Sequence, residues 1–179
     1  MKKNLNNIYL IGPMGSGKTS VGKCLATLSH TNLYDSDEEI EKATGVDIPW
    51  IFEQEGEKGF RKREAEMIKK LTHLKNIILS TGGGVIMTES NRRQLAENGV
   101  VVYLQVSVDT QLKRTARKKE SRPMLRKHNS KEKLNQLNEI RHSLYTEIAD
   151  LVYNANVLTP MSLAEQILKD IDKLKQNDQ

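Results

Sequence analysis

Short apolar runs alternate with longer helical patterns along this chain. An apolar run of about four to eight residues between turn residues is typical of a strand buried on both faces, as in a parallel sheet. Five such runs occur, at residues 8–11, 32–35, 76–80, 100–104 and 151–153. We therefore predict an α/β protein of three layers, in which a mostly parallel five-stranded sheet is flanked by helices.

Between these runs, apolar residues recur at the three- and four-residue spacing of amphipathic helices. Ser162 and Glu165 have the spacing of a capping box, which predicts the start of the last helix. We find no internal repeat and no linker, so we expect one domain over residues 1–179. The expected helices are one that ends near residue 30 and others at residues 38–44, 48–56, 59–74, 89–98, 109–117, 130–148 and 161–174.

Two helices carry charged side chains within their apolar lines. Glu64 interrupts the line of the helix at residues 59–74, and Arg61 lies one turn before it. The two side chains form either a partly buried structural ion pair or a device in which Glu64 holds Arg61 rigid for a ligand carboxylate. The apolar line itself consists of Phe60, Met67, Leu71 and Leu74.

Arg141 fills the corresponding gap in the helix at residues 130–148. A single Arg in an apolar line is costly to bury unless an anionic group meets it. We therefore favour contact with a ligand over a structural ion pair at this position. The line that Arg141 interrupts consists of Leu134, Leu137, Leu144 and Ile148.

The loop at residues 12–19, Gly-Pro-Met-Gly-Ser-Gly-Lys-Thr, fits the pattern G-x-x-x-x-G-K-[ST] between a strand and a helix. Glycines let successive backbone N–H groups point into one concavity at a helix N-terminus, which attracts phosphate. A glycine-rich turn that merely joins strand to helix is the weaker alternative. The expected nucleotide-binding residues are Gly15, Ser16, Gly17, Lys18, Thr19 and Ser20. Lys18 would reach the β and γ phosphates, and Thr19 would contact Mg²⁺.

Two further polar stretches follow predicted strands. Asp35 and Asp37 come at the end of the strand at residues 32–35, where ligands bind in open parallel sheets. They serve a metal or a substrate, or they simply cap the next helix. Gly82, Gly83 and Gly84 follow the strand at residues 76–80 and form either a tight turn or a bare floor beneath a substrate.

The composition of the chain argues against several classes of protein and kinds of site. Aromatic residues make up only 4% of the 179 residues, which argues against a nucleic-acid surface built on base stacking. The single cysteine excludes a disulfide framework and a cysteine zinc site. Because no run resembles a secretory signal or a membrane span, we expect a cytoplasmic protein without a membrane partner.

Basic residues concentrate in one segment. Residues 113–133 hold ten Lys and Arg against two Glu, whereas the net charge of the whole chain is +5. Such a block is often a solvated face or a nucleic-acid patch. Beside a phosphate-binding loop, a mobile basic lid over the nucleotide explains the charge equally well, and we place this lid at about residues 112–128.

The ordered set of motifs closely resembles the shikimate kinase family, over nearly the whole chain. The family often has Leu at the position of Met124 and Ser-Thr at the positions of Thr19 and Ser20, and neither departure removes a needed group. The matching stretches are residues 12–19, 35–37, 60–64, 82–84 and 122–125, together with Arg141 and Tyr145.

The resemblance implies a P-loop kinase fold and transfer of the γ-phosphate of MgATP to the 3-hydroxyl of shikimate, in aromatic amino-acid biosynthesis. It implies that Thr19 and Asp35 serve the Mg²⁺ site, and that Lys18, Asp37 and Arg122 are catalytic. Arg114 would pack on adenine, and Arg122 would close on the ATP phosphates. The implied substrate-binding residues are Asp37, Arg61, Gly82, Gly83, Gly84 and Arg141.

Two other functions remain possible from the residues. One is another small-substrate kinase of this fold, acting on gluconate or a nucleoside monophosphate. The other is a nucleotide-dependent switch or a nucleic-acid-binding ATPase that uses the basic segment, but it leaves Arg61 and Arg141 without a task. We expect a monomer that binds ATP and shikimate and no nucleic acid.

Overall fold

The computed structural model describes residues 3–115 and 130–177. Residues 116–129 lie outside the described part of the chain, and with them Arg122 and most of the expected lid. Residues 112–115 of that expected lid belong to helix α5 (Val108–Thr115).

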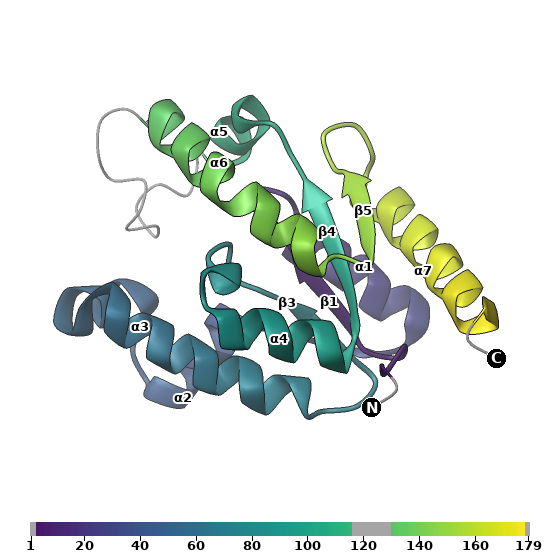
Figure 1. The fold of residues 1–179 in the computed structure, drawn as a ribbon, viewed down its shortest axis with the longest axis horizontal. Helices are drawn as coiled ribbons and strands as arrows, with labels where there is room; N and C mark the ends of the chain where they lie inside the picture. Colours follow the sequence, from purple (N-terminus) through teal and green to yellow (C-terminus); the bar gives the residue numbers. More distant parts are fainter. Residues whose placement is uncertain (1–2, 116–129, 178–179) are drawn as a thin grey trace.

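A five-stranded sheet forms the centre of the molecule (Figure 1). All neighbouring strands are parallel, in the order β2-β3-β1-β4-β5, which confirms the predicted sheet. β1 lies in the middle, and Ile8 pairs with Ile78 on one side and Val100 on the other. The strands are β1 (Ile8–Ile11), β2 (Asn32–Asp35), β3 (Ile77–Ser80), β4 (Val100–Gln105) and β5 (Leu151–Asn154).

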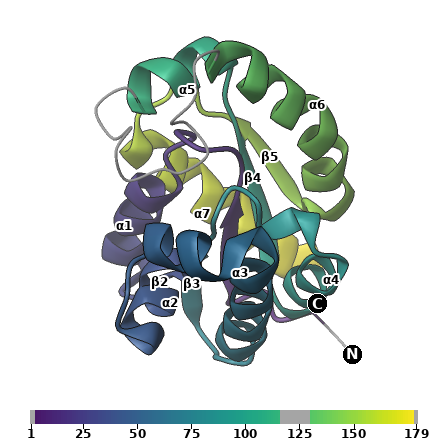
Figure 2. The same ribbon diagram turned by 90° about the vertical axis from the view of Figure 1, so that its left-hand side faces the viewer.

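Helices cover both faces of this sheet. Figure 2 shows α1 on one side of the strands and α4 and α6 on the other. α1 (Lys18–Ser29) packs with α7 (Pro160–Asn177), and α3 (Ile48–Thr72) packs with α4 (Glu89–Asn98). The remaining helices are α2 (Ser36–Thr44), α6 (Ser130–Ile148) and the short 3-10 helix η1 (Val85–Met87). Within the described residues, no helix has the length and apolar character that crossing a membrane requires.

The alternation of side chains along each strand divides the core in two. Successive side chains of a strand point to opposite faces of a sheet. Tyr9 and Ile11 of β1 therefore pack with Leu71 and Tyr145 on the face covered by α3, α4 and α6. Ile8 and Leu10 pack on the other face, against residues of α1 and α7 such as Leu25, Leu163 and Ile167. Strands buried on both faces explain why their sequences are apolar without alternation.

Several predicted boundaries differ from the structure. The two helices expected at residues 48–56 and 59–74 are confirmed: they share the label α3, but Gly56, with a non-helical φ of 69°, separates them. Leu74 follows the end of α3 and is 38% exposed, so it is not part of the buried line. The predicted capping box at Ser162 is wrong, because α7 begins earlier and the Thr159 hydroxyl accepts a hydrogen bond from the Ser162 N–H at 3.2 Å. The 3-10 helix η1 was not predicted.

The parallel topology brings several loops to one edge of the sheet. β1, β2 and β3 end at Ile11, Asp35 and Ser80, and Asp35 pairs in register with Ser80. The glycine loop, the Asp35 segment and the glycine run at residues 82–84 therefore emerge side by side. In open parallel sheets this carboxyl edge is where ligands bind.

At the opposite edge, Asn7 links three segments of chain. Its Nδ2 atom lies 2.9 Å from the Leu74 carbonyl oxygen and 3.2 Å from that of Asn98. Its Oδ1 atom accepts a hydrogen bond from the Ile77 N–H at 3.2 Å. Because Asn7 is only 1% exposed, water cannot replace these bonds if the side chain is lost.

We expect Asn7→Ala to lower the free energy of unfolding by about 2–4 kcal/mol, since it leaves several buried backbone groups unpaired. Urea unfolding measures this change. The matched control is Asn6→Ala, because Asn6 is exposed. Equal stability of the two variants would contradict the role of Asn7.

Candidate active site

The glycine loop at residues 12–19 wraps around the end of β1 and leads into α1. Gly15 and Gly17 have φ angles of 79° and 91°, which few residues other than glycine adopt. The Lys18 ammonium is buried and donates to the carbonyl oxygens of Gly12 and Pro13 at 2.8 and 2.9 Å. The Lys18 side chain is thus folded along the loop that is expected to hold phosphate.

A cleft of about 540 Å³ extends from this loop to the glycine run after β3. It brings together most of the residues that the sequence singled out as site residues. Those that line it are Gly15, Gly17, Lys18, Thr19, Ser20, Asp35, Asp37, Arg61, Gly82, Gly83, Gly84 and Arg141.

Three expected site residues stand apart from this set. Ser16 is buried beneath the loop, and its N–H donates to the Pro13 carbonyl at 3.2 Å. Arg114 donates to the carbonyl oxygens of Gly15 and Ala155, at 3.1 and 2.8 Å, and so joins the glycine loop to the segment after β5. Arg122 lies outside the described residues.

Oxygen atoms gather where α1 meets the ends of β2 and β3. The Thr19 hydroxyl donates to Asp35 Oδ2 at 3.1 Å and lies 3.3 Å from Ser80 Oγ. The other carboxylate oxygen, Asp35 Oδ1, accepts from the Asp37 N–H at 3.1 Å and caps α2. Asp35 is therefore a helix cap and also part of an oxygen cluster. Such hard oxygen donors suit Mg²⁺.

Asp37 faces the cleft from the first turn of α2. Its Oδ1 atom is buried and has no hydrogen-bond partner among the described residues. Desolvation, helped by the negative charges of Asp35 and Glu64, raises the pKa of this carboxyl to about 7, and Lys18 opposes the change. A β-carbon added at Gly82 would lie 2.9 Å from Asp37 Oδ1, so the glycine leaves room for this carboxylate.

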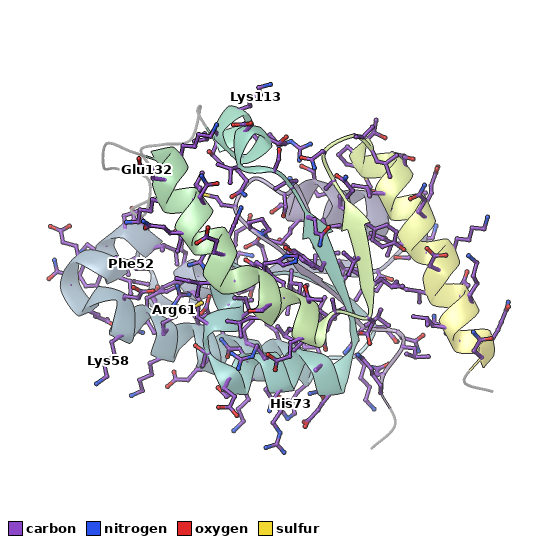
Figure 3. The ribbon with its side chains drawn as sticks, turned by 45° about the horizontal axis from the view of Figure 1, so that its top comes forward. Phe52, Lys58, Arg61, His73, Lys113 and Glu132 are labelled. Atoms are coloured by element: carbon purple, nitrogen blue, oxygen red, sulfur yellow. The ribbon has the colours of Figure 1, made fainter. Side chains whose placement is uncertain are left out.

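Arg61 is held by two carboxylates on α3. Its Nη1 atom donates to Glu64 Oε2 at 2.8 Å, and its Nη2 atom donates to Glu57 Oε1 at 3.1 Å. Figure 3 shows Lys58 projecting into solvent, whereas Arg61 lies on the side of α3 that faces the rest of the molecule. A β-carbon at Gly84 would lie 2.4 Å from Arg61 Nη2, so the guanidinium rests directly on that glycine.

Both interpretations of the Arg61 and Glu64 pair describe part of this arrangement. The two side chains form an ion pair, and Glu64 is completely buried. Burial raises the pKa of the Glu64 carboxyl, and the charge of Arg61 opposes that change. Yet Arg61 Nε and Glu64 Oε1 are buried without a partner among the described residues, so the pair keeps polar atoms for a ligand.

Arg141 reaches the same cleft from α6. It is 8% exposed, and its Nε atom is buried without a hydrogen-bond partner within the described part of the chain. Three other cleft atoms are also buried without a hydrogen-bond partner among the described residues: Asp37 Oδ1, Arg61 Nε and Glu64 Oε1. Buried polar atoms are normally paired, so this concentration of unpaired ones in a single cleft indicates a polar ligand.

Sequence reasoning missed several residues of the cleft wall. Ser80 and Thr81 follow β3 as Asp35 follows β2, so their position at a strand end was an available signal. Ile48, Phe52 and Phe60 gave no such signal, because apolar residues at helical spacing look the same in a core and in a cleft. The other lining residues that the prediction missed are Met14, Glu38 and Glu41.

Comparison with known proteins identifies the family to which this chain belongs. The family model described as "Shikimate kinase" matches residues 14–172. A shikimate kinase of Coxiella burnetii (strain CbuK_Q154) is 64% identical over 177 residues, which cover 98% of this chain and 96% of the relative. The structure of shikimate kinase from Acinetobacter baumannii in complex with shikimate has a TM-score of 0.93 and 47% identity, over 97% of this chain and 96% of that chain. A gluconokinase from Sinorhizobium meliloti 1021, with a TM-score of 0.64 and 15% identity, shares the fold. The chain belongs to the shikimate kinase family, as its motifs predicted.

Proposed function

We propose that this protein transfers the γ-phosphoryl group of MgATP to the 3-hydroxyl of shikimate, which yields shikimate 3-phosphate and ADP. The observation that supports this most is the set of buried, unpaired polar atoms of Asp37, Arg61, Glu64 and Arg141 in one cleft with the phosphate loop. Family membership supports it too, since the Acinetobacter baumannii relative is described in complex with shikimate.

The acceptor end of the cleft suits a small hydroxy acid. In this proposal Arg61 and Arg141 bind the carboxylate of shikimate, because planar guanidinium groups match carboxylate geometry. Gly82, Gly83 and Gly84 form the floor, where the lack of side chains lets the ring approach the backbone. Asp37 accepts hydrogen bonds from the ring hydroxyls, including the one that is phosphorylated.

The donor end suits the triphosphate of ATP. Backbone N–H groups of Gly15 and Gly17 would cradle the phosphates. The Ser16 N–H and the Lys18 ammonium would leave the loop carbonyls that they now contact and join them. Arg114 and Arg122 are proposed to contact adenine and the phosphates. Ser20 completes the expected nucleotide-binding set.

A metal ion is part of this proposal. Thr19 and Asp35 would hold Mg²⁺, whose charge neutralises the phosphate oxygens when it is bound. Among the described residues no three His, Cys, Asp or Glu side chains form a metal site, so phosphate and water oxygens would supply the other ligands. The Thr19, Asp35 and Ser80 oxygen cluster fits this role.

Positioning is the main contribution of the chain to catalysis. The phosphoryl group moves through a loose transition state that needs little help from a base, so alignment of the hydroxyl with the γ-phosphate matters most. Asp37 orients that hydroxyl and takes its proton, for which its raised pKa is well suited.

Other acceptors fit the cleft less well. Likeness to a gluconokinase at 15% identity shows the fold alone. A nucleoside monophosphate offers no carboxylate to the Arg pair. Most of the basic segment that would serve a nucleic-acid ATPase lies outside the described residues. We expect a cytoplasmic monomer without a nucleic-acid or membrane partner, and these points stay predictions.

A substrate panel tests the proposal directly. The purified protein is incubated with MgATP and shikimate, gluconate or AMP, and ADP release is measured. We expect release with shikimate at least about 100-fold faster than with the other two, because each lacks part of the contact set. Preference for gluconate or AMP would overturn the assignment.

Asp37→Asn tests the role of the carboxylate. We expect turnover to fall by about 10²- to 10⁴-fold, because the amide orients the hydroxyl less well and also cannot take its proton, while ATP affinity measured by calorimetry stays within about threefold. Weakened ATP binding with normal turnover would contradict the role.

The same variant tests how much folding stability is lost by burying the Asp37 carboxylate beside those of Asp35 and Glu64. The pKa of Asp37 is raised to about 7 in the folded protein, so folding stability falls as pH rises towards 7 and the full penalty remains above it. In metal-free buffer at pH 8, we expect Asp37→Asn to raise the melting temperature by a few degrees, an advantage that disappears near pH 4. Asp172→Asn, an exposed position on α7, is the control. An unchanged or lower melting temperature at pH 8 would refute the penalty.

A further inference from the structure

Tyr145 connects the two parts of the cleft that face the acid end of the substrate. Its side chain is 1% exposed and belongs to α6. The Tyr145 hydroxyl donates a hydrogen bond to the Gly83 carbonyl oxygen, in the middle of the glycine floor. Arg141 lies four residues earlier on α6, so the two side chains share one face of the helix.

The other hydrogen bonds of the glycine floor tie its two ends, and the Gly82 carbonyl accepts one from the Val85 N–H at 3.1 Å. Its first residue is tied to α2, because the Gly82 N–H donates to Ser36 Oγ at 3.0 Å. Its last residue begins the turn of η1, where the Gly84 carbonyl accepts from the Met87 N–H at 3.0 Å. Glycine backbones are permissive, so the middle of the floor depends on the bond from Tyr145.

The ring of Tyr145 is itself fixed. It stacks on Tyr103 of β4, with ring centroids 4.8 Å apart and an interplanar angle of 23°. Burial raises the pKa of the Tyr145 hydroxyl and the nearby charge of Arg141 opposes that change, so the hydroxyl keeps its proton and remains a donor. A rigid aromatic ring anchored in the sheet thus holds the floor by one bond.

The floor also touches the nucleotide side of the cleft. A β-carbon on Gly83 would lie 3.3 Å from the Met14 backbone nitrogen, so Gly83 packs against the glycine loop. The glycine loop thus supports Gly83 on one side, and the Tyr145 bond fixes its position relative to Arg141 on the other.

We propose that Tyr145 is a positioning residue for the acid substrate, whose hydroxyl sets the distance between the glycine floor and the Arg141 helix. This inference rests on the proposed function. Tyr145 acts through Gly83 and Arg141.

The test variant is Tyr145→Phe, which removes the hydroxyl and keeps the stacked ring. We expect KM and the calorimetric Kd for shikimate to rise by about 5- to 20-fold, since a buried carbonyl loses its donor and the floor is free to move. We expect kcat to stay within about threefold and KM for ATP within about twofold, the pattern of lost substrate binding.

Tyr103→Phe is the matched control. It removes a hydroxyl from the other ring of the stacked pair. That hydroxyl contacts His142 Nδ1, at 3.3 Å, and does not contact the glycine floor. We expect its constants for both substrates to stay within about twofold of the starting protein.

A double-mutant cycle with Arg141→Lys separates positioning from general structure. If Tyr145 acts together with Arg141, Tyr145→Phe has a smaller effect on shikimate Kd in the Arg141→Lys background. Additive effects overturn the proposal, as does an unchanged shikimate Kd in the single variant. A parallel loss of both substrate affinities with a large drop in melting temperature also overturns it, because that pattern is structural.

The starting protein, assayed alongside, separates this inference from the proposed function. If it fails to phosphorylate shikimate, the proposed function itself fails. If it does so and Tyr145→Phe matches it, only the role of Tyr145 is refuted.

Discussion

Burial of charge at the carboxyl edge of the sheet is the constraint on which the rest of this structure depends. Glu64 is completely buried and Arg141 is 8% exposed, in a chain that offers each of them incomplete hydrogen bonding. Removing charged groups from water costs several kcal/mol each unless partners replace the hydration. A fold tolerates this only where its elements hold the charges rigidly and a ligand later supplies the missing contacts.

Three separate parts of the chain share this task. α3 presents Arg61 and Glu64 as a pair, α6 presents Arg141, and the junction of β2 and α2 presents Asp35 and Asp37. The functional side chains of these segments lie far apart along the sequence, at residues 35 and 37, 61 and 64, and 141. The parallel order of the strands brings them together, because every β-strand ends at the same edge and each connection between strands returns the chain to the opposite one. The architecture therefore serves the chemistry by directing remote side chains into one volume.

Much of this could be predicted from local pattern, and the limits follow from physics. The strands and the glycine loop can be predicted because their patterns lie within a few consecutive residues. Arg61 and Arg141 can be recognised because each is a charged residue within an apolar line. Phe52 and Ile48 could not be recognised as cleft residues, because whether an apolar side chain meets a core or a ligand depends on distant elements. The Thr159 cap was missed for a related reason, since Pro160 at the first helical position competes with the Ser162 pattern.

The position of Asn7 has a consequence for how this chain tolerates change. The strand β1 carries an amide clasp before its first residue and the phosphate loop after its last, so two unrelated tasks lie at opposite ends of one strand. Substitutions near Asn7 are therefore expected to change the thermal stability of the protein and to leave its catalytic activity unchanged. Evolution can therefore adapt the stability of the protein to warmer or colder growth through residues near Asn7, while selection for activity acts on the phosphate loop.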